Sequence, residues 1–174
     1  MTIAERIRGR LVTLAPLRIA DLELWVRWLA DADTTRYLYG RGERPPAPPT
    51  AVALEDWGWR ILADPFRIAF GLEDAGSGQV IGNARLSPMG GRRSRFSIVI
   101  GEAGHRGRGL GTEATAMVCD YGFRQLGLRE VVLDVDPRNA AAVAAYRRAG
   151  FRQGRGSSMH LRAPDRAGAA GLAR

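Results

Sequence analysis

The sequence predicts one α/β domain built on a mixed β-sheet. Its length of 174 residues is typical of a single domain that can bury a proper core. Its 45% hydrophobic and 25% charged residues are the proportions of an ordinary globular chain. Segments that alternate in polarity with the period of a strand are interspersed with segments of helical period. Their order is a strand, two helices, a three-stranded meander, a helix, a strand, a helix and one or two short strands.

The first part of the chain indicates a strand followed by two helices. Residues 10–14 alternate enough for a strand, which Pro16 would stop. Asp21 is a good N-cap for a first helix, whose apolar stripe continues to Ala30. Residues 40–50 hold four prolines and two glycines, which predicts a loop, and a second helix is expected to follow it.

The middle of the chain changes to the period of strands. Alternating segments are expected to form strands at residues 66–70, 80–86 and 96–100. A turn rich in glycine and arginine, residues 88–93, would join the last two. The close spacing of the three strands predicts an antiparallel meander.

The second half predicts a helix, a buried strand and a last helix. A glycine-rich loop at residues 104–111 leads to a broadly apolar helix from Thr112 to about residue 126. Residues 129–135 have the composition of a buried strand. Asn139 is expected to cap the last helix, which Gly150 would end.

No repeat and no second domain is visible. We expect one domain over residues 1–162, with one or two short strands within residues 151–161. The remaining residues, 163–174, are rich in alanine, glycine and arginine and are expected to be disordered.

The composition excludes several classes of protein. One cysteine, Cys119, allows neither an internal disulfide nor a cysteine-rich metal site, and two histidines are too few for most structural zinc sites. No apolar run approaches the roughly 18 residues of a membrane helix, and the polar N-terminus does not resemble a secretory signal. We therefore expect a cytoplasmic protein without a metal, with Cys119 packed in the core of its helix.

All basic residues are arginines, and they give the chain a formal net charge of +8. A partner that carries phosphates would explain the excess, as would the codon bias of a GC-rich genome. Codon bias accounts for arginine in place of lysine but not for where the charge lies. Residues 85–108 hold six arginines and one acid, whereas residues 11–84 hold seven arginines and ten acids.

The glycine-rich loop carries the strongest chemical signal. Glycines let a backbone approach an anion closely, and the first N–H groups of a helix are unpaired donors. With Arg106 and Arg108 adding charge, the segment predicts a pyrophosphate cradle. It is not a P-loop, because no Gly-Lys-Ser/Thr follows, nor a convincing dinucleotide fingerprint. Taken alone, the loop could also be an ordinary tight connection.

Two motifs together resemble the GNAT superfamily of N-acetyltransferases. Residues 106–111, Arg-Gly-Arg-Gly-Leu-Gly, resemble its Arg/Gln-x-x-Gly-x-Gly/Ala signature. Residues 139–151 resemble its N-x-x-A-x-x-x-Y-x-x-x-G-F helix. Residues 10–16, with Trp28-Leu29 and residues 35–38, are similar to the branch of ribosomal-protein N-terminal (Rim-type) and spermidine acetyltransferases. The resemblance covers about residues 9–162 and implies a mostly antiparallel sheet with splayed central strands and about four flanking helices.

The resemblance implies an enzyme that moves the acetyl group of acetyl-CoA to a primary amine by direct attack. Strands near residues 94–101 and 128–135 would splay around the cofactor. Its pantetheine arm would pair with backbone groups of Ile98, Val99 and Ile100. The pyrophosphate would lie on the loop residues Arg106, Gly107, Arg108, Gly109, Leu110, Gly111 and Thr112.

Three further residues are candidates for roles in the reaction. Tyr146 matches the general acid of the family, beside the sulfur of CoA, and Asn139 matches a residue that binds the cofactor. On the sequence alone, Tyr146 could instead be a core aromatic and Asn139 only a cap. Glu102 is our candidate for the base or for a group that orients water, and its alternative is a plain surface carboxylate.

The acceptor and the partners are less defined. Acids in residues 11–84 would suit a cationic amine, such as a peptide N-terminus, an aminoglycoside or a polyamine. Arg95 stands where relatives of the branch often carry glutamate, which counts against polyamine specificity. The short C-terminal end predicts that a second chain completes the sheet as a homodimer. The alternatives are a CoA-binding regulatory module without activity and a nucleic-acid-binding protein, for which no recognition motif is visible.

Overall fold

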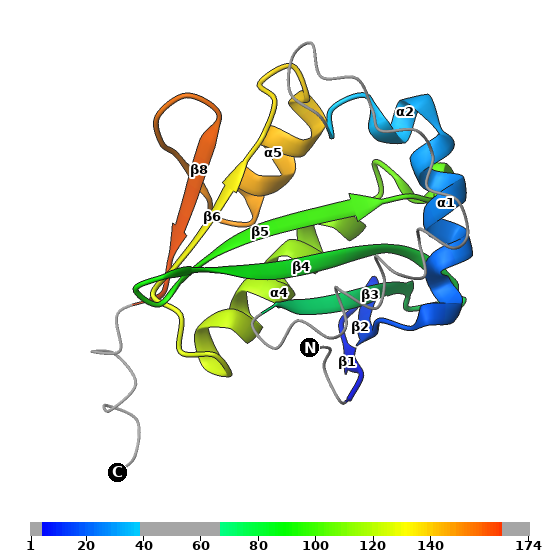
Figure 1. Ribbon diagram of the computed structural model, residues 1–174, viewed down its shortest axis with the longest axis horizontal. Coiled ribbons are helices and arrows are strands. Elements are labelled where there is room, and N and C mark those ends of the chain that lie inside the picture. Colours follow the sequence, from blue (N-terminus) through cyan, green and yellow to red (C-terminus); the bar gives the residue numbers. More distant parts are fainter. Residues whose placement is uncertain (1–4, 39–66, 165–174) are drawn as a thin grey trace.

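Eight strands form one sheet in the computed structural model, which describes residues 5–38 and 67–164 (Figure 1). The strands are β1 (Ile7–Arg8), β2 (Val12–Pro16), β3 (Ile68–Asp74), β4 (Val80–Gly90), β5 (Arg93–Ile100), β6 (Glu130–Asp134), β7 (Arg152–Gln153) and β8 (Ser158–Arg162). Their order across the sheet is β1-β2-β3-β4-β5-β6-β8-β7. All neighbours are antiparallel except β5 and β6, which are parallel. The predicted mixed, mostly antiparallel sheet is confirmed.

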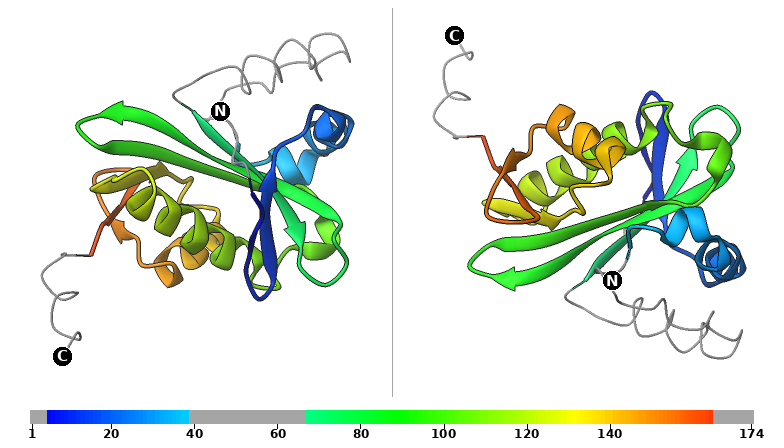
Figure 2. Two further views of the ribbon diagram at one scale, coloured as in Figure 1. Left: turned by 90° about the horizontal axis from the view of Figure 1, so that it is seen from below. Right: turned by 90° about the horizontal axis from the view of Figure 1, so that it is seen from above.

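Helices cover both faces of this sheet. The described helices are α1 (Leu22–Ala30), α2 (Ala32–Thr35), α4 (Leu110–Arg124) and α5 (Ala140–Arg148), with short 3₁₀ turns at Ile19–Asp21 and Ala103–His105. In Figure 2, α4 and α5 lie on one face of the sheet, and α1 and α2 lie on the other. None of the helices that the structure describes is long and apolar enough to cross a membrane.

The first helix lies where the sequence predicts it, but the strand before it, β2, runs two residues later than predicted and includes Pro16 as its last residue. Asp21 precedes α1, but its carboxylate caps nothing and accepts hydrogen bonds from the backbone and guanidinium of Arg18. The reason is local: Asp21 ends a 3₁₀ turn with φ −82° and ψ −5°, whereas a capping residue needs an extended backbone. The predicted loop at residues 40–50 and the helix after it lie outside the described residues.

The meander is confirmed, but its second turn is shorter than predicted. β4 continues through Pro88 to Gly90, and only Gly91 and Arg92 separate it from β5. Pro88 is tolerated because the register shifts between Pro88 and Gly90, and proline without an N–H fits such an irregularity. The expectation of a turn across residues 88–93 was therefore wrong in extent.

The C-terminal elements follow the predicted caps. α4 begins at Leu110 rather than at Thr112. Asn139 caps α5, since its Oδ1 accepts a hydrogen bond from the Ala142 N–H at 3.1 Å. Gly150, with φ +97°, follows the end of that helix. The short strands β7 and β8 confirm the expected final pair, and the tail beyond residue 164 lies outside the described residues.

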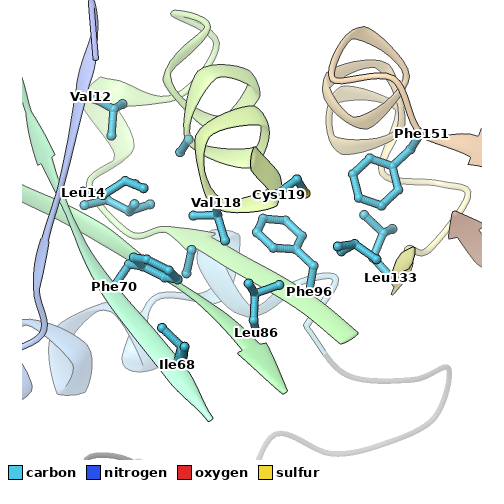
Figure 3. Close-up of a cluster of buried hydrophobic side chains, with 14 of the residues drawn as sticks. Val12, Leu14, Ile68, Phe70, Leu86, Phe96, Val118, Cys119, Leu133 and Phe151 are labelled. Carbon is cyan, nitrogen blue, oxygen red and sulfur yellow. The ribbon is translucent and has the colours of Figure 1, made fainter. Parts of the chain in front are cut away.

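The main core lies between the sheet and helices α4 and α5 (Figure 3). Phe70 and Phe96 project from the sheet to meet Val118 and Cys119 of α4. Cys119 is 1% exposed, and burial raises the pKa of its thiol to about 12, so it is not a nucleophile. The prediction that this cysteine packs in the core is confirmed.

Candidate active site

A gap opens in the sheet between β5 and β6. The two strands pair only where residues 93–95 meet residues 130–132, and beyond that point they diverge (Figure 1). The rest of β5, residues 96–100, has no strand on that side within the described residues. One edge of a strand is thus left open in the middle of the sheet, as the resemblance implied.

The register decides which backbone groups of β5 face the gap. The Gly101 N–H donates to the Ile81 carbonyl, so the backbone groups of alternate residues, including Val99, point toward β4. Those of Ile98 and Ile100 point the other way, into the gap. Two of the three predicted pantetheine partners therefore face the gap, and Val99 does not.

Cross-strand ion pairs hold β5 and β6 together where the gap closes. Arg93 pairs with Glu130 at 2.7 Å, and Arg95 pairs with Asp134 across the start of the gap. The neighbouring Arg92 donates to a backbone carbonyl at 2.6 Å. This cluster therefore has structural partners, and its charge is not a free basic surface.

The glycine-rich loop has the geometry of an anion cradle. Gly107 and Gly109 have φ of +74° and +86°, in the left-handed region that glycine adopts without strain. Gly109 is the N-cap of α4 and provides no capping side chain. The first N–H groups of α4, at residues 110–112, lack helical partners and lie at the positive end of the helix dipole.

The two arginines of the loop differ in what they contact. Arg106 points inward, and its Nε donates to the Ile100 carbonyl at 3.0 Å. Its Nη2 donates to the Gly101 carbonyl at 2.9 Å and to the Thr34 hydroxyl at 2.5 Å. Arg108 is exposed and has no side-chain partner within the described residues. The side chain of Arg106 is thus engaged within the protein and that of Arg108 is free, and the contact of either with a pyrophosphate stays a prediction.

Tyr146 lies at the apex of the gap. Its ring meets Phe96 edge-on, with centroids 6.3 Å apart, and lies 6.0 Å from the Phe151 ring. Phe96 directly follows Arg95, the last residue of β5 that pairs with β6. Burial raises the pKa of Tyr146 to about 12, so the phenol keeps its proton at neutral pH.

The hydroxyl of Tyr146 is free although its ring is packed. The hydroxyl makes no hydrogen bond within the described residues. Its oxygen is also not fully buried there. The residue therefore has the features of both predicted readings, a core aromatic ring and an available proton donor. Asn139 likewise is a cap, and its amide nitrogen has no partner among the described residues.

Glu102 forms hydrogen bonds with helix α1, which lies on the face of the sheet opposite α4 and α5 (Figure 2). Its Oε1 accepts hydrogen bonds from the Arg27 guanidinium and, at 2.9 Å, from the Trp28 indole N–H. Beside it, Gly101 packs so closely on Trp28 that a Cβ would lie 2.0 Å from the indole. Glu102 is 21% exposed on its side chain and is not a plain surface carboxylate. Its role as a base stays a prediction.

A further residue near the loop was not predicted. Glu113, in the first turn of α4, accepts hydrogen bonds from the backbone N–H groups of Arg10, Leu11 and Val12 at 2.9, 2.5 and 3.0 Å. An acidic residue at that position is typical of a helix N-terminus. Nothing in the sequence indicates that it would anchor a segment a hundred residues away.

Two open pockets of the described structure lie beside α5 and β8. One cavity of about 310 Å³ lies between α5 and the loop that joins β7 to β8. Another, of about 810 Å³, lies along β8 and is lined by Arg93, Glu130 and Arg162 among others. Neither is lined by Tyr146 or by the glycine-rich loop. Within the described residues, no cluster of histidine, cysteine and acidic side chains is placed to hold a metal.

Comparisons with known proteins agree with this geometry. Residues 11–152 match the family model described as an acetyltransferase (GNAT) domain. The spermidine N(1)-acetyltransferase of Escherichia coli strain K12 is 42% identical over 60 residues, which are 34% of this chain. That match spans only 32% of the relative's own length.

Solved structures share the fold. A GNAT-family acetyltransferase from Bacillus anthracis superposes with a TM-score of 0.75 at 14% identity, over 91% of this chain and 98% of that one. The spermidine N-acetyltransferase of Vibrio cholerae, solved with CoA and spermine, gives a TM-score of 0.75 at 24% identity. That superposition covers 88% of this chain and 96% of the other.

Proposed function

The chain belongs to the GNAT acetyltransferase family, and from that premise we propose that it transfers the acetyl group of acetyl-CoA to a primary amine. The observation that carries the proposal is the gap between β5 and β6. An open strand edge there leads to the N-terminus of α4, and Tyr146 lies where the strands part. This combination provides a place for an extended chain, for its phosphates and for a proton donor.

The residues of the gap fit the cofactor in three parts. The backbone groups of Ile98 and the N–H of Ile100 can pair with the amides of the pantetheine arm, whereas the Ile100 carbonyl already accepts a hydrogen bond from Arg106. The N–H groups at the start of α4, with the side chain of Arg108, suit a pyrophosphate. The free amide of Asn139, at the start of α5, can donate a further hydrogen bond to the cofactor.

The reaction needs two proton transfers that this chain can serve. When bound, acetyl-CoA supplies a thioester that a neutral amine can attack. The phenol of Tyr146, protonated at neutral pH, would donate its proton to the departing sulfur. The proton of the amine would leave toward Glu102 or through water, since Oε2 of Glu102 has no partner within the described residues.

We propose a primary amine as the acceptor, either a peptide N-terminus or a small molecule. Two described acids of residues 11–84 are engaged, with Asp31 bonded to Thr34 and Asp33 paired with Arg36 at 2.6 Å, whereas Glu23 of α1 is exposed without a side-chain partner within the described residues. Arg95 faces Asp134 and leaves no free carboxylate there. Glu43, Glu55 and Asp56, on which the expected acidic wall also rests, lie outside the described residues, so a cationic acceptor stays a prediction.

A panel of amine acceptors tests the proposal. Peptides with free N-termini, spermine and kanamycin would each be incubated with the protein and acetyl-CoA, and release of free thiol would be followed. Thiol release that requires both the protein and one acceptor supports the proposal. Binding of CoA without turnover on any acceptor would instead indicate a regulatory module. Binding of DNA at physiological salt without CoA binding would indicate the nucleic-acid alternative.

Replacing Arg108 by glutamine is expected to raise the dissociation constant for CoA about fivefold, because one exposed charge-assisted contact to phosphate is lost. Calorimetry would measure the effect, which should shrink at high salt. Arg162→Gln is the matched control, since its side chain is 85% exposed and lies at the far end of β8. Equal affinities for the two variants would exclude Arg108 from the cradle.

The homodimer expected from the sequence stays a prediction. The outer strand β7 has two residues and pairs with His160 and Met159 only, which leaves much of the β8 edge uncovered. An uncovered edge can pair with a second chain. Light scattering is expected to give twice the mass of the chain, and a monomeric mass would contradict the dimer.

A further inference from the structure

We propose that Arg106 is a positioning residue that fixes the corner between α1 and α2 to the end of β5, and that it is not a ligand of the cofactor. The inference rests on the proposed function, because α1 and α2 belong to residues 11–84, where we expect the amine acceptor to bind. It departs from the expectation that every charged side chain of the glycine-rich loop binds phosphate. It concerns how the acceptor side is held in place.

The contacts of Arg106 use the fork of its guanidinium. Nε and Nη2 donate to the consecutive carbonyls of Ile100 and Gly101, at 3.0 and 2.9 Å. Nη2 also donates to the Thr34 hydroxyl on α2 at 2.5 Å. One planar group thus joins the end of β5 to a helix far away in the sequence, a geometry that lysine cannot reproduce.

The α2 side of this contact is itself ordered. Asp31 caps α2 by accepting hydrogen bonds from the N–H and the hydroxyl of Thr34, at 2.9 and 2.5 Å. These bonds, with a weaker contribution from Arg106, hold the pKa of Asp31 below its usual value. The Asp31 carboxylate lies 3.5 Å from Arg106 and is partly exposed, so the ion pair adds little and the bonds to the carbonyls and to Thr34 carry the contact.

A second contact secures the neighbouring helix. Glu102 accepts hydrogen bonds from Arg27 and Trp28 of α1, and Gly101 packs against the same indole. The contacts of Glu102 and Arg106 therefore flank Gly101, at the point where β5 leads into the glycine-rich loop. Arg106 is the part of this arrangement that reaches α2.

Two consequences separate positioning from cofactor binding. If Arg106 holds the corner, its loss frees α1 and α2 while the N–H groups of the cradle stay in place. If Arg106 binds phosphate, its loss weakens CoA binding and leaves the corner unchanged. Arg108, free and two residues away, provides the matched control with the opposite expectation.

Hydrogen exchange measured by mass spectrometry, with calorimetry of CoA binding, tests the proposal on the full chain. In Arg106→Gln, amides of α1 and α2 are expected to exchange about tenfold faster, with the dissociation constant for CoA changed less than about twofold. In Arg108→Gln, exchange in α1 and α2 should be unchanged and the affinity for CoA lower. Arg106→Lys should resemble Arg106→Gln, because charge without the fork does not restore the contacts.

Weaker CoA binding in Arg106→Gln that lysine restores, with unchanged exchange in α1 and α2, would overturn the proposal. If Arg106→Gln does not fold, Thr34→Val removes the contact from the α2 side together with the hydroxyl bond to Asp31, and unchanged exchange in that variant would equally overturn the proposal. On an acceptor found active, Arg106→Gln should raise the acceptor KM and leave the KM for acetyl-CoA unchanged. A wild-type chain that does not bind CoA would refute the proposed function, whereas the exchange comparison would still decide the role of Arg106.

Discussion

Tyr146→Phe is expected to lower kcat about 10²-fold, because the substitution removes the proton donor for the leaving thiolate and little else. The ring contacts with Phe96 and Phe151 remain, so the fold and the gap should be preserved. CoA binding should change by less than about twofold, because the phenol acts on a group that forms during the reaction. Steady-state rates on an active acceptor, with calorimetry of CoA binding, measure the two effects separately.

Tyr121→Phe is the matched control for this prediction. Tyr121 also packs edge-on in the core, with its ring 5.3 Å from the Phe70 ring, but it lies on α4 away from the apex of the gap. Tyr121→Phe should retain nearly full activity.

The pH profile of the wild type provides a second check. Because the pKa of Tyr146 is about 12, the phenol keeps its proton, and kcat should not fall through deprotonation of Tyr146 between about pH 7 and about pH 10. Equal rates for Tyr146→Phe and the wild type would remove Tyr146 from the mechanism.

Glu113→Ala is expected to lower the free energy of unfolding by about 2–3 kcal/mol. The carboxylate satisfies three consecutive backbone N–H groups, those of Arg10, Leu11 and Val12, and alanine would leave them without an acceptor. Glutamine at this position keeps one acceptor oxygen but not the charge, so an intermediate loss is expected. Urea unfolding would report the change as a lower midpoint at an unchanged m-value.

Asp120→Ala on the same helix is the control for this measurement. Asp120 forms an exposed ion pair with Arg124 at 2.7 Å, one helical turn apart, and such pairs contribute little. Its loss should be within about 0.5 kcal/mol. If the two variants lose equal stability, Glu113 is only another surface acid, and the N-terminal strand is held by its pairing with β3.

Local signals of the sequence predicted much of the fold, whereas the position of the gap was implied by the resemblance to the GNAT superfamily. Asn139 and Gly150 mark the ends of α5 through capping chemistry that acts within a few residues. The glycines of the loop indicate positive φ because other residues avoid it. The alternation of residues 96–100 predicts a strand without any knowledge of its neighbours.

What the sequence could not predict depends on contacts between distant segments. Whether Val99 faces the gap depends on the register of β5 on β4, which one residue of shift would reverse. Arg106 and Arg108 have the same side chain two positions apart, and only the placement of α2 distinguishes them. The partners of Arg93 and Arg95 lie on β6, and no local pattern identifies them.

The most direct test of the central claim is the mass of an amine acceptor after incubation with the protein and acetyl-CoA, measured beside the thiol released. The account predicts that at least one primary amine of the panel gains one acetyl group for each thiol formed, and that no gain occurs without the protein. A chain that binds CoA but leaves every amine unmodified and releases no thiol would contradict the claim.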